Sequence, residues 1–209
     1  VYEAMPSLAR KFLMAGKSGL NLTHSEDYSL FTARFGNKEH QIKKHLANFT
    51  PENLLTFVKE LGVETFVGST GRVFPKEMKA SPMLRKWVQR LQARGVSFHV
   101  RHRWCGWEND FCIFETPDGI FKNKFDATIL ATGAASWPKL GSKGEWVPWL
   151  EHKGVTINPF IPANCGFCIE WSNHFSEKFH GQPIKSVICL LKGFKQQGEF
   201  VVSRTGIEG

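Results

Sequence analysis

An apolar run that ends in a glycine turn constrains the fold of this chain more than any other feature. Residues 125–133 read Phe-Asp-Ala-Thr-Ile-Leu-Ala-Thr-Gly. A short apolar run bounded by turn residues favours a buried strand. At the carboxyl edge of a parallel sheet, a turn of small residues lets the backbone pass close to a cofactor. The run therefore predicts a buried strand over residues 125–131 that ends at such a site, with an ordinary buried strand and glycine turn as the alternative.

Signals for helices and strands alternate on both sides of this run. Thr50 can cap a helix whose first position is Pro51, and Leu54, Val58 and Leu61 then recur at helical spacing. The pattern predicts an α/β fold. The expected helices cover residues 6–13, 51–61, 81–94 and 145–152, and the expected strands cover residues 1–3, 64–67, 72–74, 96–100, 104–107, 111–115 and 120–122.

The hydrophobic pattern of the sequence changes near Asn158. Short alternating runs at residues 166–170, 186–191 and 199–203 are separated by glycine and proline, which is typical of β-rich domains. We therefore expect one domain over residues 1–157 and part of a β-rich second domain over residues 158–209.

Composition narrows the cellular setting and the class of partner. The chain has a net charge of +8, five cysteines and no long uncharged apolar run. An odd number of scattered cysteines argues against a secreted disulfide framework, and the missing apolar run argues against a membrane span, so a cytoplasmic protein is expected. The charge suits either a polyanionic partner or an enzyme that binds phosphates. Because the basic residues are spread along the chain, the enzyme is favoured and nucleic acid is not the expected partner.

Glu3 lies where the first strand is expected to end. In dinucleotide-binding folds, an acidic side chain at the end of the second strand accepts hydrogen bonds from ribose hydroxyls. Most glutamates at strand ends are merely solvated, so that alternative stays open. The companion motif G-x-G-x-x-G occurs nowhere in the 209 residues.

A glycine-punctuated loop follows the first expected helix. Arg10 and Lys11 precede the loop, and Gly16, Gly19 and Asn21 fall within it. Glycine lets a backbone approach a ligand closely, exposed N–H groups suit phosphate oxygens, and nearby cations offset the charge of a diphosphate. The alternative is a surface loop with two solvated cations.

Taken in order along the chain, these segments resemble a family of bacterial flavoproteins. The family is that of the BaiN-like or aminoacetone-oxidase-like FAD-dependent oxidoreductases, and the resemblance is to its uncharacterised branch of small flavoproteins. It implies an oxidoreductase of unknown substrate, with FAD as cofactor and NAD(P)H as a candidate reductant. It also implies a Rossmann-like FAD-binding domain followed by the start of a β-rich inserted domain on the substrate side. The segments that carry the resemblance are residues 1–25, 71–75, 126–138, 162–167 and 205–209.

The resemblance also implies roles for individual residues. Glu3 would bind the adenosine ribose, Arg10 and Lys11 would lie beside the diphosphate and ribityl parts of FAD, and the backbone near Trp104 would contact adenine. No catalytic acid or base follows from it, although His24 falls near the expected flavin end. The residues implied at the flavin end of the loop are Gly16, Lys17, Gly19, Leu20 and Asn21, and those implied on the opposite face of the cofactor are Ala131, Thr132 and Gly133.

The chain departs from the pattern of this family at both ends. The family carries its G-x-G-x-x-G turn just before the segment that corresponds to Val1, and it returns to the flavin domain after the segment that corresponds to Gly209. We therefore expect these 209 residues to form an incomplete FAD-binding domain that is inactive alone. We expect enzymatic activity of the full-length protein.

Other motifs offer competing interpretations. Cys165-Gly-Phe-Cys168 matches a redox dithiol, but a strand is expected there, which would point the two thiols to opposite faces. His99, His102 and Cys105 fit no standard zinc spacing, so no metal site is expected. Arg101-His-Arg-Trp104 combines cations with an aromatic ring that could stack on a base. A non-catalytic binding module and a basic nucleic-acid-binding domain are therefore the alternatives to a flavin enzyme.

Overall fold

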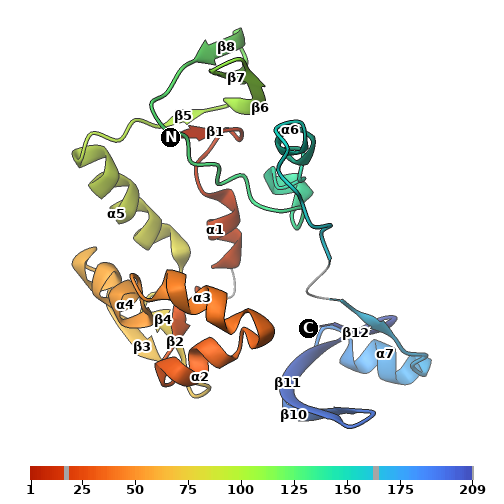
Figure 1. The fold of residues 1–209 in the computed structure, drawn as a ribbon. Coiled ribbons are helices and arrows are strands. Elements are labelled where there is room, and N and C mark those ends of the chain that lie inside the picture. Colours follow the sequence, from red (N-terminus) through yellow and green to blue (C-terminus); the bar gives the residue numbers. More distant parts are fainter. Residues whose placement is uncertain (17–18, 162–164, 209) are drawn as a thin grey trace. The chain divides into compact units, whose positions relative to one another are not determined.

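The structure is a computed structural model that describes residues 1–16, 19–161 and 165–208. Lys17, one of the residues expected at the flavin end, lies outside the described residues. The chain divides into two units, Val1–Ile157 and Asn158–Gly209. Helices occur together with both parallel and antiparallel strand pairs (Figure 1), so the expected mixed α/β class is confirmed. That the units are an FAD-binding domain and a β-rich inserted domain stays a prediction.

A parallel strand pair organises one end of the first unit. Strand β1 (Tyr2–Glu3) pairs with β5 (His99–Val100) in parallel. Helix α1 (Arg10–Ala15) follows β1, and helix α5 (Ala80–Ala93) precedes β5 and contacts α1. Because the two strands are parallel, their carboxyl ends meet at the same edge.

A group of helices and a small sheet lie between α1 and α5 in the sequence. The sheet is antiparallel, with the strand order β2-β4-β3. Apolar residues from this group, together with α1 and α5, form a buried cluster around Leu20, Val58 and Met83. The elements are β2 (Thr23–His24), α2 (Tyr28–Ala33), the 3-10 helix η1 (Gly36–Lys38), α3 (Glu39–Leu46), α4 (Pro51–Glu60), β3 (Thr65–Val67) and β4 (Arg72–Pro75).

Helix α4 begins where the sequence predicts. The Thr50 hydroxyl accepts a hydrogen bond from the Asn53 backbone N–H at 3.3 Å, and the Asn53 side-chain oxygen accepts one from the Thr50 N–H at 2.9 Å. This reciprocal capping satisfies donors that the first helical turn would otherwise leave unpaired. Val58 is fully buried on the inner face of the helix, which confirms the amphipathic pattern.

An antiparallel meander packs against β1. Its strands are β6 (Arg103–Glu108), β7 (Phe111–Thr116) and β8 (Gly119–Asn123), in that order, which confirms the predicted meander. The Tyr2 ring stacks on Phe114 of β7 with ring centroids 4.5 Å apart and on His99 of β5 at 4.7 Å. Tyr2 therefore joins the meander to the parallel pair through aromatic contact.

The expected buried strand over residues 125–131 is wrong. The structure gives no strand there, and Ile129 is 93% exposed. A strand needs a neighbour to accept and donate its backbone hydrogen bonds. No strand of the described residues pairs with this segment. Its central residues are therefore exposed, while Phe125 and Leu130 are half-buried and Phe125 packs against Tyr2.

Smaller differences have local causes. The first helix begins at Arg10 rather than at Pro6, because Ala9 adopts a left-handed conformation with φ of 53°. The strand expected over residues 96–100 is confined to β5. The helix expected over residues 145–152 is α6 (Val147–Glu151), which follows the 3-10 helix η2 (Pro138–Leu140).

The second unit is a small antiparallel sheet with one short helix. Its strands are β9 (Phe167–Cys168), β10 (Pro183–Leu191), β11 (Phe194–Ser203) and β12 (Gly206–Glu208), ordered β10-β11-β12-β9. Helix α7 (Asn173–Phe179) was not predicted. Its N-cap is Ser172, whose hydroxyl accepts a hydrogen bond from the Phe175 N–H. Across the described residues, no helix combines the length and the apolar character needed to cross a membrane.

Replacing Thr50 by alanine should destabilise the first unit. Thr50→Ala removes the cap of α4, and loss of such a cap costs about 1 kcal/mol. Thr56→Ala on the exposed face of the same helix is the matched control, because alanine favours a helix interior. Urea unfolding of both variants measures the difference, and equal midpoints would contradict the capping role.

Candidate functional site

The carboxyl ends of β1 and β5 hold the Glu3 side chain in place. The Glu3 carboxylate accepts a hydrogen bond from the Met5 N–H at 2.9 Å, and the Glu3 carbonyl accepts one from the His102 N–H at 3.0 Å. The Met5 carbonyl accepts in turn from the Arg101 N–H at 3.1 Å. The turn after β1 is thus fastened to the segment after β5, with a half-buried, oriented carboxylate at the edge of the pair.

A second junction joins residues that are far apart in the sequence. The Lys11 ammonium donates to the Ser142 hydroxyl at 3.2 Å, and that hydroxyl donates to the Ala134 carbonyl at 2.5 Å. The Trp146 indole N–H donates to the Gly133 carbonyl at 2.7 Å. The structure therefore brings together two predicted site residues, Lys11 and Gly133, through the buried Ser142.

Gly133 has a steric reason to be glycine. Its φ is +72°, and a Cβ atom built there would lie 2.9 Å from the Ser142 hydroxyl oxygen. A side chain would therefore be strained by the backbone conformation and would crowd the atom that Lys11 contacts. Ala131 and Thr132, which precede it, are exposed in the extended segment.

A cavity of about 420 Å³ lies beside the turn that follows β1. Cations dominate its polar lining. Glu145 partly balances them, since it pairs with Arg103 at 2.8 Å and with Lys143 at 3.4 Å. The excess of positive charge suits an anionic ligand. The lining residues are Met5, Arg103, Pro138, Lys139, Gly141 and Lys143.

The glycine loop lies at the other end of α1. A Cβ on Gly16 would overlap Ala80, which shows how closely α1 meets the start of α5. Gly19 has φ of +125°, and a Cβ there would lie 2.8 Å from the end of the Met78 side chain. The Leu20 N–H donates to the Met78 carbonyl at 3.3 Å. Gly16, Gly19 and Leu20 therefore lie against the start of α5 and the residues just before it.

The side chains predicted at the flavin end do not lie beside Glu3. The Leu20 side chain is 4% exposed and belongs to the core, so only its backbone can face a ligand. The Asn21 side chain is exposed. At the opposite end of α1, the Arg10 Nε donates to the Ser7 hydroxyl at 2.8 Å. Helix α1 runs between the parallel pair and the β2-β4-β3 sheet in Figure 1. The predicted residues before and after this helix are therefore spread along its length.

Trp104 lies on β6 within a tryptophan cluster. Its ring meets Trp107 edge-on at 4.7 Å and Trp149 of α6 at 5.0 Å. Its indole N–H is buried and has no hydrogen-bond partner among the described residues. A Cβ on Gly106 would come within 3.0 Å of the Trp149 ring, so the glycine allows α6 to approach β6. The Trp104 side chain is thus occupied by the cluster, which leaves its backbone for any contact with a ligand.

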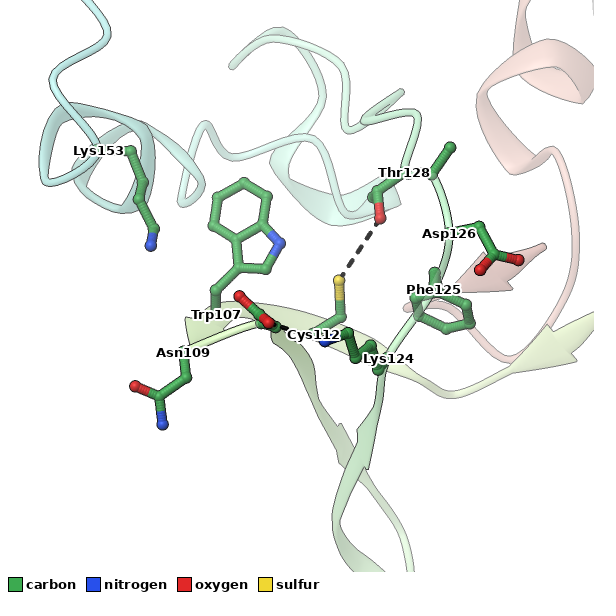
Figure 2. Close-up of a pocket in the computed structure, with 10 residues that line it drawn as sticks. Trp107, Asn109, Cys112, Lys124, Phe125, Asp126, Thr128 and Lys153 are labelled. Carbon is green, nitrogen blue, oxygen red and sulfur yellow. Dashed lines mark hydrogen bonds and ion pairs between the residues drawn. The ribbon is translucent and has the colours of Figure 1, made fainter.

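A hollow of about 440 Å³ lies at the turn between β6 and β7 (Figure 2). The segment after β8, which the sequence placed in a buried strand, forms one wall. The turn after α6 contributes Lys153. The full lining is Trp107, Asn109, Asp110, Cys112, Lys124, Phe125, Asp126, Ala127, Thr128 and Lys153.

His24 is held in a network beside the glycine loop. Its Nδ1 accepts from the Glu26 N–H at 3.1 Å, and its Nε2 lies 2.9 Å from the Thr70 carbonyl. Glu26 in turn receives two hydrogen bonds from the Arg34 guanidinium, at 2.5 and 2.8 Å. The Arg34 hydrogen bonds lower the pKa of the Glu26 carboxyl. The network fixes the end of β2 against the turn before β4.

The structure also places the cysteine, histidine and arginine motifs that offered competing interpretations of the sequence. Cys168 lies on β9 opposite Gly206, and both Cys165 and Cys168 are exposed free thiols. His99 stacks on Tyr2, and residues 1–16, 19–161 and 165–208 contain no cluster of histidine, cysteine or acidic residues that could hold a metal. Arg103 is paired with Glu145 and Glu115, so its guanidinium is already engaged by carboxylates.

Sequence reasoning missed Ser142, Trp146 and the cations Lys139 and Lys143. The contact of Ser142 with Lys11, that of Trp146 with Gly133, and the place of the two lysines in the cavity depend on the path of the chain after the exposed segment. The only local sign was the pair Gly141 and Gly144, which have φ of 88° and 73° and make the tight turns around Ser142.

Replacing Gly133 by alanine should disturb the Lys11–Ser142 junction. Gly154 is a matched control, because its φ is +79° but nothing lies within 4 Å of a Cβ built there. Both variants share the cost of the left-handed conformation, while Gly133→Ala adds overpacking worth about 1–3 kcal/mol. Urea unfolding of the two variants gives the difference, and equal stabilities would show that the Ser142 contact does not constrain Gly133.

Replacing Arg34 by methionine should raise the pKa of the Glu26 carboxyl toward its ordinary value of 4.5. A carboxyl with a lowered folded-state pKa contributes stability that is present above the unfolded pKa and lost as pH falls through the folded pKa. The variant should therefore lose less stability on acidification than the unmodified chain. An NMR titration of the Glu26 carboxyl measures the shift, with Arg94→Met as the control, and an unchanged pKa would refute the role of Arg34.

Among curated proteins, a search found no match to this chain. The model of the family described as the HI0933-like protein Rossmann domain matches residues 1–206, which is nearly the whole chain. The chain therefore belongs to the HI0933-like family of FAD-binding, Rossmann-type oxidoreductases.

Proposed function

We propose that residues 1–157 supply the adenosine and diphosphate side of an FAD site in a bacterial, cytoplasmic oxidoreductase of the BaiN-like branch. One observation carries the proposal. The oriented Glu3 carboxylate, the Lys11–Ser142–Gly133 junction and a cation-lined cavity all belong to the region around the carboxyl edge of the β1–β5 pair. Ligands of open α/β sheets bind at this edge.

The residues at this edge fit FAD in their chemistry. A carboxylate accepts the two hydroxyls of a ribose, and Glu3 still has an oxygen beyond the one that receives the Met5 N–H. A diphosphate carries negative charge, and Lys11 holds its ammonium against a neutral hydroxyl rather than a carboxylate. Gly133 lets the chain pass Ser142 without a side chain. These features support the assignment of Glu3, Lys11 and Gly133.

The remaining residues extend the proposal along α1. Arg10 would lie beside the diphosphate, and the Trp104 backbone would contact adenine. Bound FAD would supply the electron-transfer chemistry, while the chain would bind and orient it. A small organic molecule of undefined identity would be the substrate, with NAD(P)H as the candidate reductant. The residues proposed for the flavin end are Gly16, Lys17, Gly19, Leu20 and Asn21, and those proposed for the opposite face are Ala131 and Thr132 together with Gly133.

Replacing Glu3 by alanine in the full-length protein should weaken FAD binding. A hydrogen bond to a charged group is worth about 1.5–3 kcal/mol, so affinity should fall by about tenfold or more. Glu64→Ala is the control, because Glu64 is exposed and paired only with Lys76 among the described residues. Titration of the apoprotein with FAD, followed by flavin fluorescence, measures both variants. Equal affinities would remove Glu3 from the site, and full-length protein that never binds FAD would overturn the function itself.

The choice of reductant has a separate test. Anaerobic titration of the FAD-loaded full-length protein with NADH and with NADPH should bleach the visible flavin bands with at least one of the two. Bleaching by dithionite alone would exclude nicotinamide nucleotides as reductants and leave FAD binding intact.

A further inference from the structure

The hollow at the β6–β7 turn lies outside the residues proposed for FAD. Its volume of about 440 Å³ is in the range of cavities that hold small organic ligands, which runs from about 300 to 1,000 Å³. It lies entirely within the first unit. Nothing in the proposed function uses its side chains.

An indole forms the apolar surface of this hollow. Trp107 is half-buried, and its far side packs against Trp104 of the tryptophan cluster. Trp104 contacts Trp149 of α6 in turn, so the indole is supported by a neighbour on its own strand, and that neighbour is supported by α6. A rigid aromatic face of this kind stacks flat rings at little entropic cost.

The charges in the hollow favour an anion. The Lys153 ammonium lies 6.0 Å from the centre of the Trp107 ring, on the side toward α6, and forms no ion pair with any carboxylate of the described residues. Lys124 pairs with Asp110 at 2.8 Å. Asp126, the other acidic residue of the lining, points away from the Trp107 ring (Figure 2). Two ammonium groups thus share one carboxylate.

Small polar groups complete the side opposite Lys153. The Cys112 sulfur lies 3.8 Å from the Thr128 hydroxyl oxygen, and both point toward each other beside the Trp107 indole (Figure 2). They line the hollow beside the indole. The hollow therefore combines an aromatic face with a cation at one end.

We propose that this hollow binds a small aromatic carboxylate, with its ring on the Trp107 indole and its carboxylate on the Lys153 ammonium. A flat ring uses the indole face, and a single negative charge pairs with the Lys153 ammonium, which makes no direct ion pair among the described residues. The site does not depend on FAD, so it can be tested without any flavin.

Three small probes separate the parts of this proposal. Benzoate carries both the ring and the charge, benzamide keeps the ring without the charge, and acetate keeps the charge without the ring. Titration calorimetry and the NMR signal of the Trp107 indole N–H should show saturable binding of benzoate, with benzamide and acetate weaker by about tenfold or more. Absence of saturable benzoate binding, or benzamide binding as tightly as benzoate, would overturn the proposal.

Matched variants identify the residues involved. Lys153→Met should weaken benzoate binding by about tenfold or more, because it removes the charge. Lys178→Met is the control, since Lys178 also lies over an aromatic ring, that of Phe179, at 5.4 Å, but in the second unit. Equal benzoate affinity of the Lys153→Met and Lys178→Met proteins would refute the role of Lys153.

The ring contact has its own pair of variants. Trp107→Phe should retain most of the benzoate affinity, while Trp107→Leu should lose it, with circular dichroism to establish that each variant is folded. If Trp107→Leu does not fold, the benzoate-to-acetate ratio in the Trp107→Phe protein still reports the ring contact. An unchanged affinity of folded Trp107→Leu protein would place the ligand elsewhere.

Discussion

The parallel pairing of β1 with β5 is the interaction on which the rest of the first unit depends. It joins the first residues of the chain to residues nearly 100 positions later, through hydrogen bonds such as that from the His99 N–H to the Val1 carbonyl at 2.8 Å. Two paired residues alone contribute little. The pair persists because Tyr2 stacks on His99 within the pair and on Phe114 of the adjoining meander, and these contacts remove apolar surface from water. The same pairing aims the Glu3 carboxylate and anchors the meander.

The sequence predicted those parts of the fold whose signals are local. Thr50, Pro51 and the spacing of Val58 define α4 because capping and amphipathic periodicity act within one helix. The strand predicted over residues 125–131 was wrong for the opposite reason. Their apolar pattern is that of a buried strand, but burial depends on a neighbouring strand, and no described strand supplies one.

The site divides in the same way. Glu3 could be proposed from the sequence, because a carboxylate at a strand end has a known use in dinucleotide folds, and its binding role stays a prediction. Ser142 could not, since its importance arises only when Lys11 and Ala134 approach it from distant parts of the chain. Leu20 shows the limit of a role assigned by resemblance. Its side chain lies in the core, so any contact with a ligand is left to its backbone.

The contact between Lys11 and Ser142 spans 131 residues. A ribosome adds about 5–20 residues per second, so Lys11 leaves the peptidyl-transferase centre on the order of ten seconds before Ser142 does. During that interval α4 can form, because its cap is local and its core partners Leu20 and Met83 precede Ser142 in the chain. The edge proposed to bind the cofactor cannot close until the turn at Gly141 has emerged. The half of the unit around α4 therefore has time to fold first, and the proposed cofactor site becomes competent only afterwards during synthesis.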